Sequence, residues 1–240
     1  MKKSLKDETE TVDERALAQV TGDDLAPVNQ GPVGLGEVSG EIDERDLKVP
    51  VLKITHGVGD LSAVFNLGDL IINNTHKIAG RDEFVNMTVL SIRKYYEENL
   101  PYDANGPMPQ MFNTKAEVVA AGLTTEWINN QPPSINEVGE MTLLLEQREG
   151  VDEVCFSTEF EGKKYAMARF TVRKTQYGAA KDVFTARAMQ LSECGLLFGA
   201  WTIHTESKPL KSGNRAMIPV LKLTGKHPVE FVEFIKERYA

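Results

Sequence analysis

Cysteines, histidines and long apolar runs are scarce in this sequence of 240 residues, and each scarcity excludes a class of protein. The two cysteines, Cys155 and Cys194, form no CxxC pair, so neither a disulfide scaffold nor a zinc ribbon is expected. The four histidines are scattered without the spacing of metal ligands. No apolar run is long enough to span a membrane, and no apolar stretch follows the basic N-terminus. We therefore expect a cytoplasmic protein with no membrane partner.

Catalytic motifs are missing as well. The glycine-rich stretch GPVGLGEVSG superficially resembles a nucleotide-binding loop, but it follows no expected strand and has no Lys-Ser or Lys-Thr after it. The stretch ESKPLKSG places serine and lysine close together, yet the sequence pairs neither residue with a base. We therefore predict that the protein is not an enzyme and that it uses no metal or cofactor.

Charge is distributed unevenly along the chain. The formal net charge is −8, and residues 1–47 alone have a net charge of −7. Residues 163–226, in contrast, contain 12 Lys or Arg against three acidic residues, a net charge of +9. A basic region of this size within an acidic protein indicates a polyanionic partner.

The first 46 residues contain no aromatic residue and many acidic ones. Such a segment cannot bury enough apolar surface to offset the entropy lost on ordering, so we predict a disordered acidic arm at residues 1–46. The arm is interpreted either as a solvated tail, as a recruiting arm for replication or recombination proteins, or as a competitor for the basic region.

Residues 47–240 are predicted to form a single α+β domain that is rich in strands. Three strands within residues 47–99 are expected to form a β-meander, with the last strand covered on both faces. A Pro-rich insertion at about 100–139 follows, and it contains a short helix capped near Thr114 and stopped at Gly122. Long irregular connections of this kind tend to be functional or mobile.

The C-terminal half shows clearer periodicities. Segments 141–150, 152–162 and 163–174 are predicted as strands joined by tight turns. Apolar residues three or four positions apart after Gly178 predict a helix of about 12 residues. Residues 201–223 are predicted to form a hairpin, and the chain should end in a helix that begins near Pro228.

The basic region combines the two elements that single-stranded nucleic acid requires, which are cations for the phosphates and aromatic rings on which bases stack. Its hairpin tip, KPLKSGNR, is suited to closing over a bound strand. The candidate nucleic-acid-binding residues are Lys163, Lys164, Tyr165, Arg169, Arg173, Lys174, Tyr177, Lys181, Trp201, Lys208, Lys211, Arg215 and Lys222.

Ordinary structural explanations compete with this interpretation. Trp201 is a large aromatic residue of the kind that usually fills a core. Alternating Lys and Arg on a strand commonly form its solvated face, and Lys on a hairpin can protect an edge strand from pairing. The regional excess of positive charge is therefore a stronger signal than any one residue.

The succession of VPVLKITHGVGD, VNMTVLSIRKYYEEN, an excursion ending in EW, AMARFTVRKTQYGAAKDVFTARA and the late basic hairpin resembles bacteriophage single-stranded DNA-binding proteins. The resemblance covers about residues 48–226. It implies an OB-like barrel or curled antiparallel sheet with one or two packed helices, whose strand face and loops bind oligonucleotides.

We therefore expect non-sequence-specific binding of single-stranded DNA in phage replication or recombination, in the cytoplasm of the infected host. A phage structural or assembly protein, a host-protein-binding inhibitor and an enzyme accessory protein are the alternatives, each using the basic face for protein contact. Homo-oligomerisation is left open.

Overall fold

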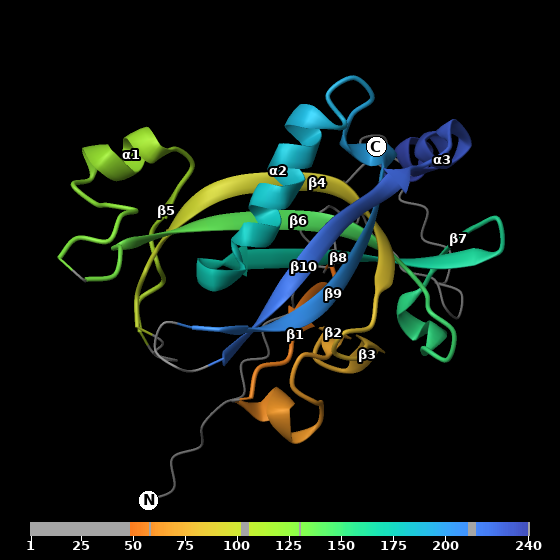
Figure 1. Cartoon of the computed structure of the whole chain (residues 1–240), viewed down its shortest axis with the longest axis horizontal. Coiled ribbons are helices and arrows are strands. Elements are labelled where there is room, and N and C mark those ends of the chain that lie inside the picture. Colours follow the sequence, from red (N-terminus) through yellow and green to blue (C-terminus); the bar gives the residue numbers. More distant parts are fainter. Residues whose placement is uncertain (1–48, 58, 102–105, 130, 211–214, 240) are drawn as a thin grey trace, which may run out of the picture. The chain divides into compact units, whose positions relative to one another are not determined.

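The computed structural model describes residues 49–57, 59–101, 106–129, 131–210 and 215–239. The acidic arm that we predict at residues 1–46 therefore lies outside the described residues. The described part is an α+β structure built around one large curled sheet (Figure 1).

Ten strands form this sheet, in the order β10-β9-β4-β6-β8-β1-β2-β3, with β5 paired to β4 and β7 paired to β8. All neighbouring strands are antiparallel except β1 and β8, which run parallel. The strands are β1 (Val51–Ile54), β2 (Leu70–Ile72), β3 (His76–Ala79), β4 (Val85–Glu98), β5 (Met111–Phe112), β6 (Ile135–Glu146), β7 (Thr158–Phe160), β8 (Lys163–Arg173), β9 (Gly199–Pro209) and β10 (Arg215–Lys226).

Two helices cover opposite faces of the sheet. The main core contains Ala168 of β8 and Val183 of α2 (Gly178–Met189), and in Figure 1 α2 lies across the strands. A second cluster joins Tyr165 of β8 to Phe231 of α3 (Val229–Tyr239). Because alternate residues of a strand point to opposite faces, β8 supplies Ala168 to one core and Tyr165 to the other.

The link between β8 and α2 reverses the chain at Lys174, which has a φ of 53° in the left-handed region that L-residues rarely adopt. A short 3-10 turn, η3 (Lys174–Gln176), then leads into α2. On the opposing strand β6, Gly139 lies directly under Ala180 of α2, so that any side chain at residue 139 would collide with the helix. Close approach of α2 to the sheet therefore depends on this glycine.

The Pro-rich insertion contains β5 and the short helix α1 (Lys115–Ala120). The Thr114 hydroxyl caps α1 by accepting a hydrogen bond from the Glu117 N–H (3.2 Å), and Gly122 follows with a φ of 73°. The start and stop predicted for this helix are therefore confirmed. Val118 of α1 packs in a small cluster with Tyr96 and Ile135, which anchors the insertion to the ends of β4 and β6.

Several other local predictions are confirmed. The helix expected after Gly178 is α2, the expected hairpin is β9–β10, and α3 ends the described chain. The β-meander is correct only for β1, β2 and β3, because β4 pairs with β6 and β9 in the middle of the sheet. The strand expected at 152–162 is instead a 3-10 turn, η2 (Glu153–Cys155), followed by the short strand β7. The expected OB-like form has five strands, whereas the sheet of the described residues has ten.

None of the described helices has both the length and the apolar character needed to cross a membrane.

Candidate functional site

All three rings predicted to stack on bases are core residues, and Tyr177, like Tyr165, is only 6% exposed. Trp201 of β9 is only 2% exposed and belongs to the main core. Tyr165 is 6% exposed and its ring packs against Phe231 of α3, with the ring centroids 5.4 Å apart. Because a base can stack only on an exposed face, the prediction of stacking platforms at Trp201, Tyr165 and Tyr177 is wrong for this structure, and the ordinary explanation for Trp201 is confirmed.

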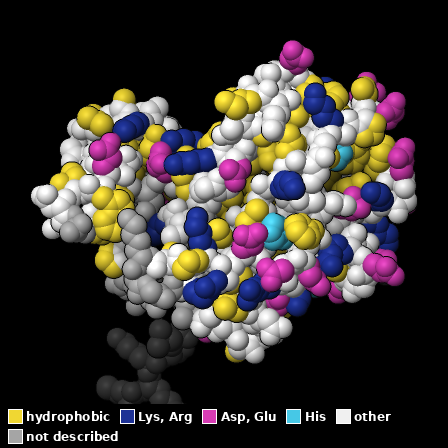
Figure 2. All heavy atoms as spheres, in the orientation of Figure 1, with side chains coloured by type: hydrophobic (Ala, Val, Ile, Leu, Met, Phe, Trp, Pro, Cys, Tyr) yellow, Lys and Arg dark blue, Asp and Glu magenta, His cyan; other side chains and the backbone are white. Residues whose placement is uncertain are grey.

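Four of the predicted cations are paired with carboxylates, so they add little net positive potential. The carboxylates come from β4, β6 and η2, outside the basic region in sequence, which is why a regional charge count misses them. The pairs are Lys163–Glu146, Lys164–Glu153, Arg169–Glu140 and Arg173–Glu97. Figure 2 shows the mixing of signs directly, because Lys and Arg are interspersed with Asp and Glu over the face that it draws.

The hairpin cations Lys208, Arg215 and Lys222 lie on β9 and β10. Because β10 ends the strand order, its cations lie on an edge strand, where positive charge opposes unwanted strand pairing. Arg215 also donates hydrogen bonds to the hydroxyl (2.7 Å) and carbonyl (2.9 Å) of Ser207. Lys211 lies outside the described residues.

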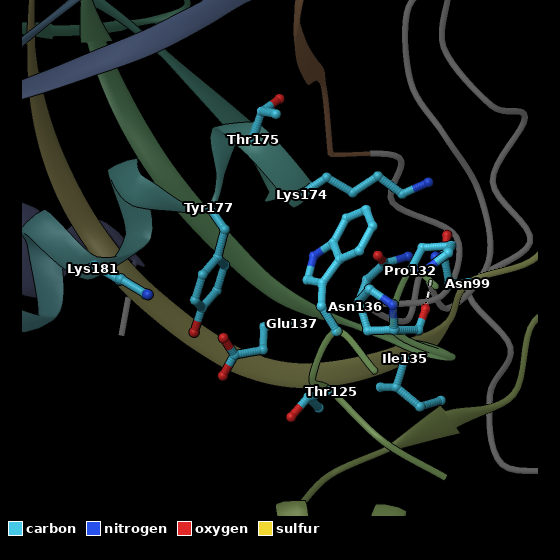
Figure 3. Close-up of a pocket in the computed structure, with 12 residues that line it drawn as sticks. Asn99, Thr125, Pro132, Ile135, Asn136, Glu137, Lys174, Thr175, Tyr177 and Lys181 are labelled. Carbon is cyan, nitrogen blue, oxygen red and sulfur yellow. Dashed lines mark hydrogen bonds between the residues drawn. The ribbon is translucent and has the colours of Figure 1, made fainter. Parts of the chain in front are cut away.

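The other three predicted residues converge on one cleft of about 560 Å³, which we call the Trp127 cleft. Figure 3 shows Tyr177, which directly precedes α2, and Lys181 of α2 on one side of this cleft and Asn99, Pro132 and Asn136 on the other. The residues that determine its chemistry are Trp127, Asn136, Glu137, Lys174, Tyr177 and Lys181.

Trp127 lies in the Pro-rich insertion and is 69% exposed, which is unusual for so large an apolar side chain. A backbone bridge between Ile128 and Gln131 closes the turn that comes after it, and Pro132 continues the wall of the cleft. The sequence predictions did not include Trp127. A tryptophan inside a Pro-rich excursion is the signal that could have identified it, since such excursions are often functional.

Glu137 is the only carboxylate among the described residues that line the Trp127 cleft. The Lys94 ammonium donates to Glu137 Oε1 over 2.6 Å and so neutralises it. Lys174 and Lys181 are exposed, and no carboxylate among the described residues lies within 4.0 Å of either ammonium group. Within the described part of the chain, the cleft therefore has two cations that no carboxylate compensates.

The ring of Tyr177 lines the cleft near the ammonium groups of Lys94 and Lys181. Its ring centroid lies 5.7 Å from the Lys94 Nζ and 5.6 Å from the Lys181 Nζ, within the range of cation–π attraction. Burial raises the pKa of Tyr177, although Lys94 opposes the shift, so its hydroxyl stays protonated at neutral pH. Burial lowers the pKa of Lys94, but hydrogen bonds to Glu137, Tyr177 and Tyr96 outweigh it and raise the pKa overall.

At the cleft, the first residues of β6 have no strand partner on the side of β8 among the described residues. β6 begins at Ile135, but β8 pairs with β6 only from Val138 onward, because the chain turns away after Arg173 at Lys174. Residues 135–137 therefore have no partner strand on that side among the described residues. The Ile135 N–H donates to the Thr124 carbonyl of the insertion over 3.0 Å, and Asn136 lines the cleft.

A second groove, of about 1010 Å³, lies over the face of β8 that carries Arg169 and Arg173. A smaller cleft joins the two, since its lining includes Lys174 of the Trp127 cleft and Arg173 of the groove. Both arginines of the groove are paired with carboxylates. No cluster of His, Cys, Asp or Glu among the residues that the structure describes could hold a metal ion.

Comparison of the chain with protein-family models, with curated proteins and with solved structures gives no match in any of the three.

Proposed function

We propose that the protein binds single-stranded DNA and that the Trp127 cleft is the principal contact. The observation that carries this proposal is the meeting of two uncompensated cations, Lys174 and Lys181, with the exposed indole of Trp127 in one cleft. Phosphate binding by cations and base stacking on an aromatic ring together suffice for binding without sequence specificity.

The two lysines and the tryptophan have different roles in binding. Lys174 and Lys181 attract the phosphates, while the indole of Trp127 offers a face for one base. The cleft opens at the N-terminal end of α2, whose first turn contains no acidic residue. The partial positive charge of a helix N-terminus adds to the attraction for phosphate.

The proposal also covers the class of protein, its biological role and the acidic arm. We infer the OB-like, phage single-stranded DNA-binding character from the sequence resemblance and from the curled sheet, and with it a role in replication or recombination in the cytoplasm of the infected host. The acidic arm is proposed to recruit replication or recombination proteins or to compete for the basic region. No catalytic step is assigned to any residue.

A second candidate function is protein contact, as in a phage structural or assembly protein or an inhibitor of a host protein. The observation that favours it is the set of exposed apolar side chains on the Pro-rich insertion. These are Met108, Met111, Val119, Trp127 and Ile128. Apolar side chains of this size on one excursion suit a protein partner better than a phosphate backbone.

Salt dependence of affinity tests the proposal. The affinity of the full chain for a fluorescent oligothymidine is measured at several salt concentrations, for the wild type and for the double variant Lys174→Gln/Lys181→Gln. We expect a steep log–log slope for the wild type, reduced in the variant by about 1.4 if each lysine meets one phosphate of a single strand.

A matched control removes two cations from the hairpin, in Lys208→Gln/Lys222→Gln. Both of these lysines are exposed and lie outside the cleft, so the control should retain the wild-type slope. Absence of binding even at low salt would refute the proposed function and favour protein contact. Equal losses in the two double variants would show that general charge, and not the cleft, determines affinity.

A further inference from the structure

The side-chain amide of Asn136 lines the Trp127 cleft and makes no hydrogen bond to the residues that the structure describes. The residue is 8% exposed, lies near the start of β6 and lines the Trp127 cleft. Asn99 beside it is engaged, since its Nδ2 donates to the Pro133 carbonyl over 2.8 Å. The Asn136 amide, in contrast, has no hydrogen-bonding partner among the described residues. Figure 3 shows both residues on the same side of the cleft.

The Asn136 amide is not one of the fully buried unsatisfied groups of the described chain, so it is open to the solvent of the cleft. A ligand that enters the cleft can take the place of that water and bond to the amide. Its position is also well fixed, because Asn136 pairs with Glu97 of β4 in the sheet register. A side chain on a paired strand keeps its amide in a fixed position, as recognition of a planar ligand requires.

The chemistry of an amide narrows the ligand. One side chain offers a donor (Nδ2) and an acceptor (Oδ1) next to each other, and adenine presents the complementary pair at N6 and N7. Guanine presents two acceptors at the same edge, which suit Arg or Lys, and the pyrimidines present a donor beside an acceptor only on their Watson–Crick edges, so N7 distinguishes the proposed contact. A purine also offers a larger face than a pyrimidine for stacking on Trp127, and a cleft of about 560 Å³ is within the range that holds small-molecule ligands.

We propose that the Trp127 cleft selects adenine at one nucleotide position, with Asn136 reading the N6–N7 edge of a base stacked on Trp127. The inference rests on the proposed function and adds a base preference to it. Neighbouring nucleotides, bound through phosphate by Lys174 and Lys181, contribute affinity without preference.

The test compares fluorescent hexanucleotides on the full wild-type chain: oligothymidine, the same oligomer with one central adenine, and that oligomer with 7-deazaadenine in place of adenine. We expect the adenine oligomer to bind about tenfold more tightly than oligothymidine, as one bidentate contact predicts. The 7-deaza base lacks the N7 acceptor but keeps the ring face, so its binding should return toward that of oligothymidine.

The variant Asn136→Ser provides the second arm. It should lose the adenine preference and keep the affinity for oligothymidine within about twofold, since no phosphate contact is removed. Equal binding of all three oligomers by the wild type would overturn the adenine inference alone and leave the proposed function standing. Failure of every oligomer to bind would overturn the proposed function itself. Retention of the preference with 7-deazaadenine would overturn the assigned N6–N7 edge.

Discussion

The Lys94 ammonium and the Glu137 carboxylate lie 2.6 Å apart at the base of the Trp127 cleft. The two residues come from neighbouring strands, β4 and β6, and their side chains are 36% and 34% exposed. Partly exposed ion pairs stabilise a fold only slightly. The main effect of this pair is therefore to neutralise the negative charge of Glu137 in the cleft that a ligand would enter. Without Lys94, the carboxylate would face an incoming phosphate.

Replacement of Lys94 by methionine should therefore weaken oligonucleotide binding by about fivefold, since an uncompensated carboxylate near a phosphate costs on the order of 1 kcal/mol in a partly solvated site. Fluorescence anisotropy with oligothymidine measures the effect. The double variant Lys94→Met/Glu137→Gln should recover most of the lost affinity, because neither charge remains. If the double variant binds as weakly as Lys94→Met, neutralisation of Glu137 is not the role of Lys94.

Trp127 and Trp201 should respond in opposite ways to replacement by alanine. Trp127→Ala removes a side chain that is 69% exposed, so the free energy of unfolding should change by no more than about 0.5 kcal/mol. Its affinity for oligothymidine should fall by about 1–3 kcal/mol, the energy of one stacked base.

Trp201→Ala serves as the structural counterpart. It empties a core site that is 2% exposed and should lower the free energy of unfolding by roughly 3–5 kcal/mol. Urea denaturation followed by circular dichroism measures both variants. A stable Trp201→Ala protein with impaired binding would restore Trp201 as a stacking platform.

Lys174 combines an unusual backbone conformation with a cation, and two substitutions separate these roles. Its φ of 53° favours glycine, so Lys174→Gly should be at least as stable as the wild type. At an ordinary position, the same change costs about 1 kcal/mol. Lys174→Ala keeps the unfavourable conformation and should be less stable than the glycine variant.

Both Lys174 variants should bind oligothymidine more weakly than the wild type and with a smaller salt slope, because each lacks the ammonium group. Denaturation and anisotropy on the same samples provide the two readouts. Wild-type affinity in Lys174→Gly would show that the residue is needed for the turn alone.

His227 predicts a pH dependence of stability. Its Nε2 lies 2.7 Å from the Thr88 hydroxyl and its ring packs against Phe231, with the centroids 4.5 Å apart. Burial lowers the pKa of His227 below the ordinary value of 6.5, and nearby Lys163 lowers it further while Glu146 and the Gly199 backbone oppose the shift. The unfolded chain therefore takes up a proton at a higher pH than the folded protein does.

It follows that the contribution of neutral His227 is complete above pH 6.5 and is lost as the pH falls through 6.5 toward the lower pKa of the folded state. The free energy of unfolding should decrease over this interval, and His227→Gln should reduce the slope. Denaturant titrations at several pH values give the comparison, with pH of about 8 as the reference, where the histidine is neutral in both states. An unchanged slope in the variant would assign the effect to other groups, such as His56, whose pKa is also lowered by burial.

The sequence predicted one part of the candidate site and missed the other. Lys174, Tyr177 and Lys181 lie within eight consecutive residues at the start of a predicted helix, and the regional excess of cations together with the aromatic residues placed them among the candidates. Trp127 and Asn136 come from the Pro-rich insertion and from the following strand, and no local pattern joins them to α2. Their meeting depends on how β6 and the insertion pack against η3.

By itself, the sequence determined the elements whose signals are local: the cap and stop of α1, the period of α2, the β9–β10 hairpin and the C-terminal helix. Capping groups and side-chain periodicity act within a few residues, so they can be read without the fold. Only the tertiary structure decided which charges remain uncompensated and which rings are exposed. Carboxylates of β4 and β6 neutralise Arg173 and Arg169, the core encloses Trp201, and the insertion leaves Trp127 in solvent. Burial and ion pairing depend on segments distant in the chain, because packing, and not sequence position, sets the distances between them.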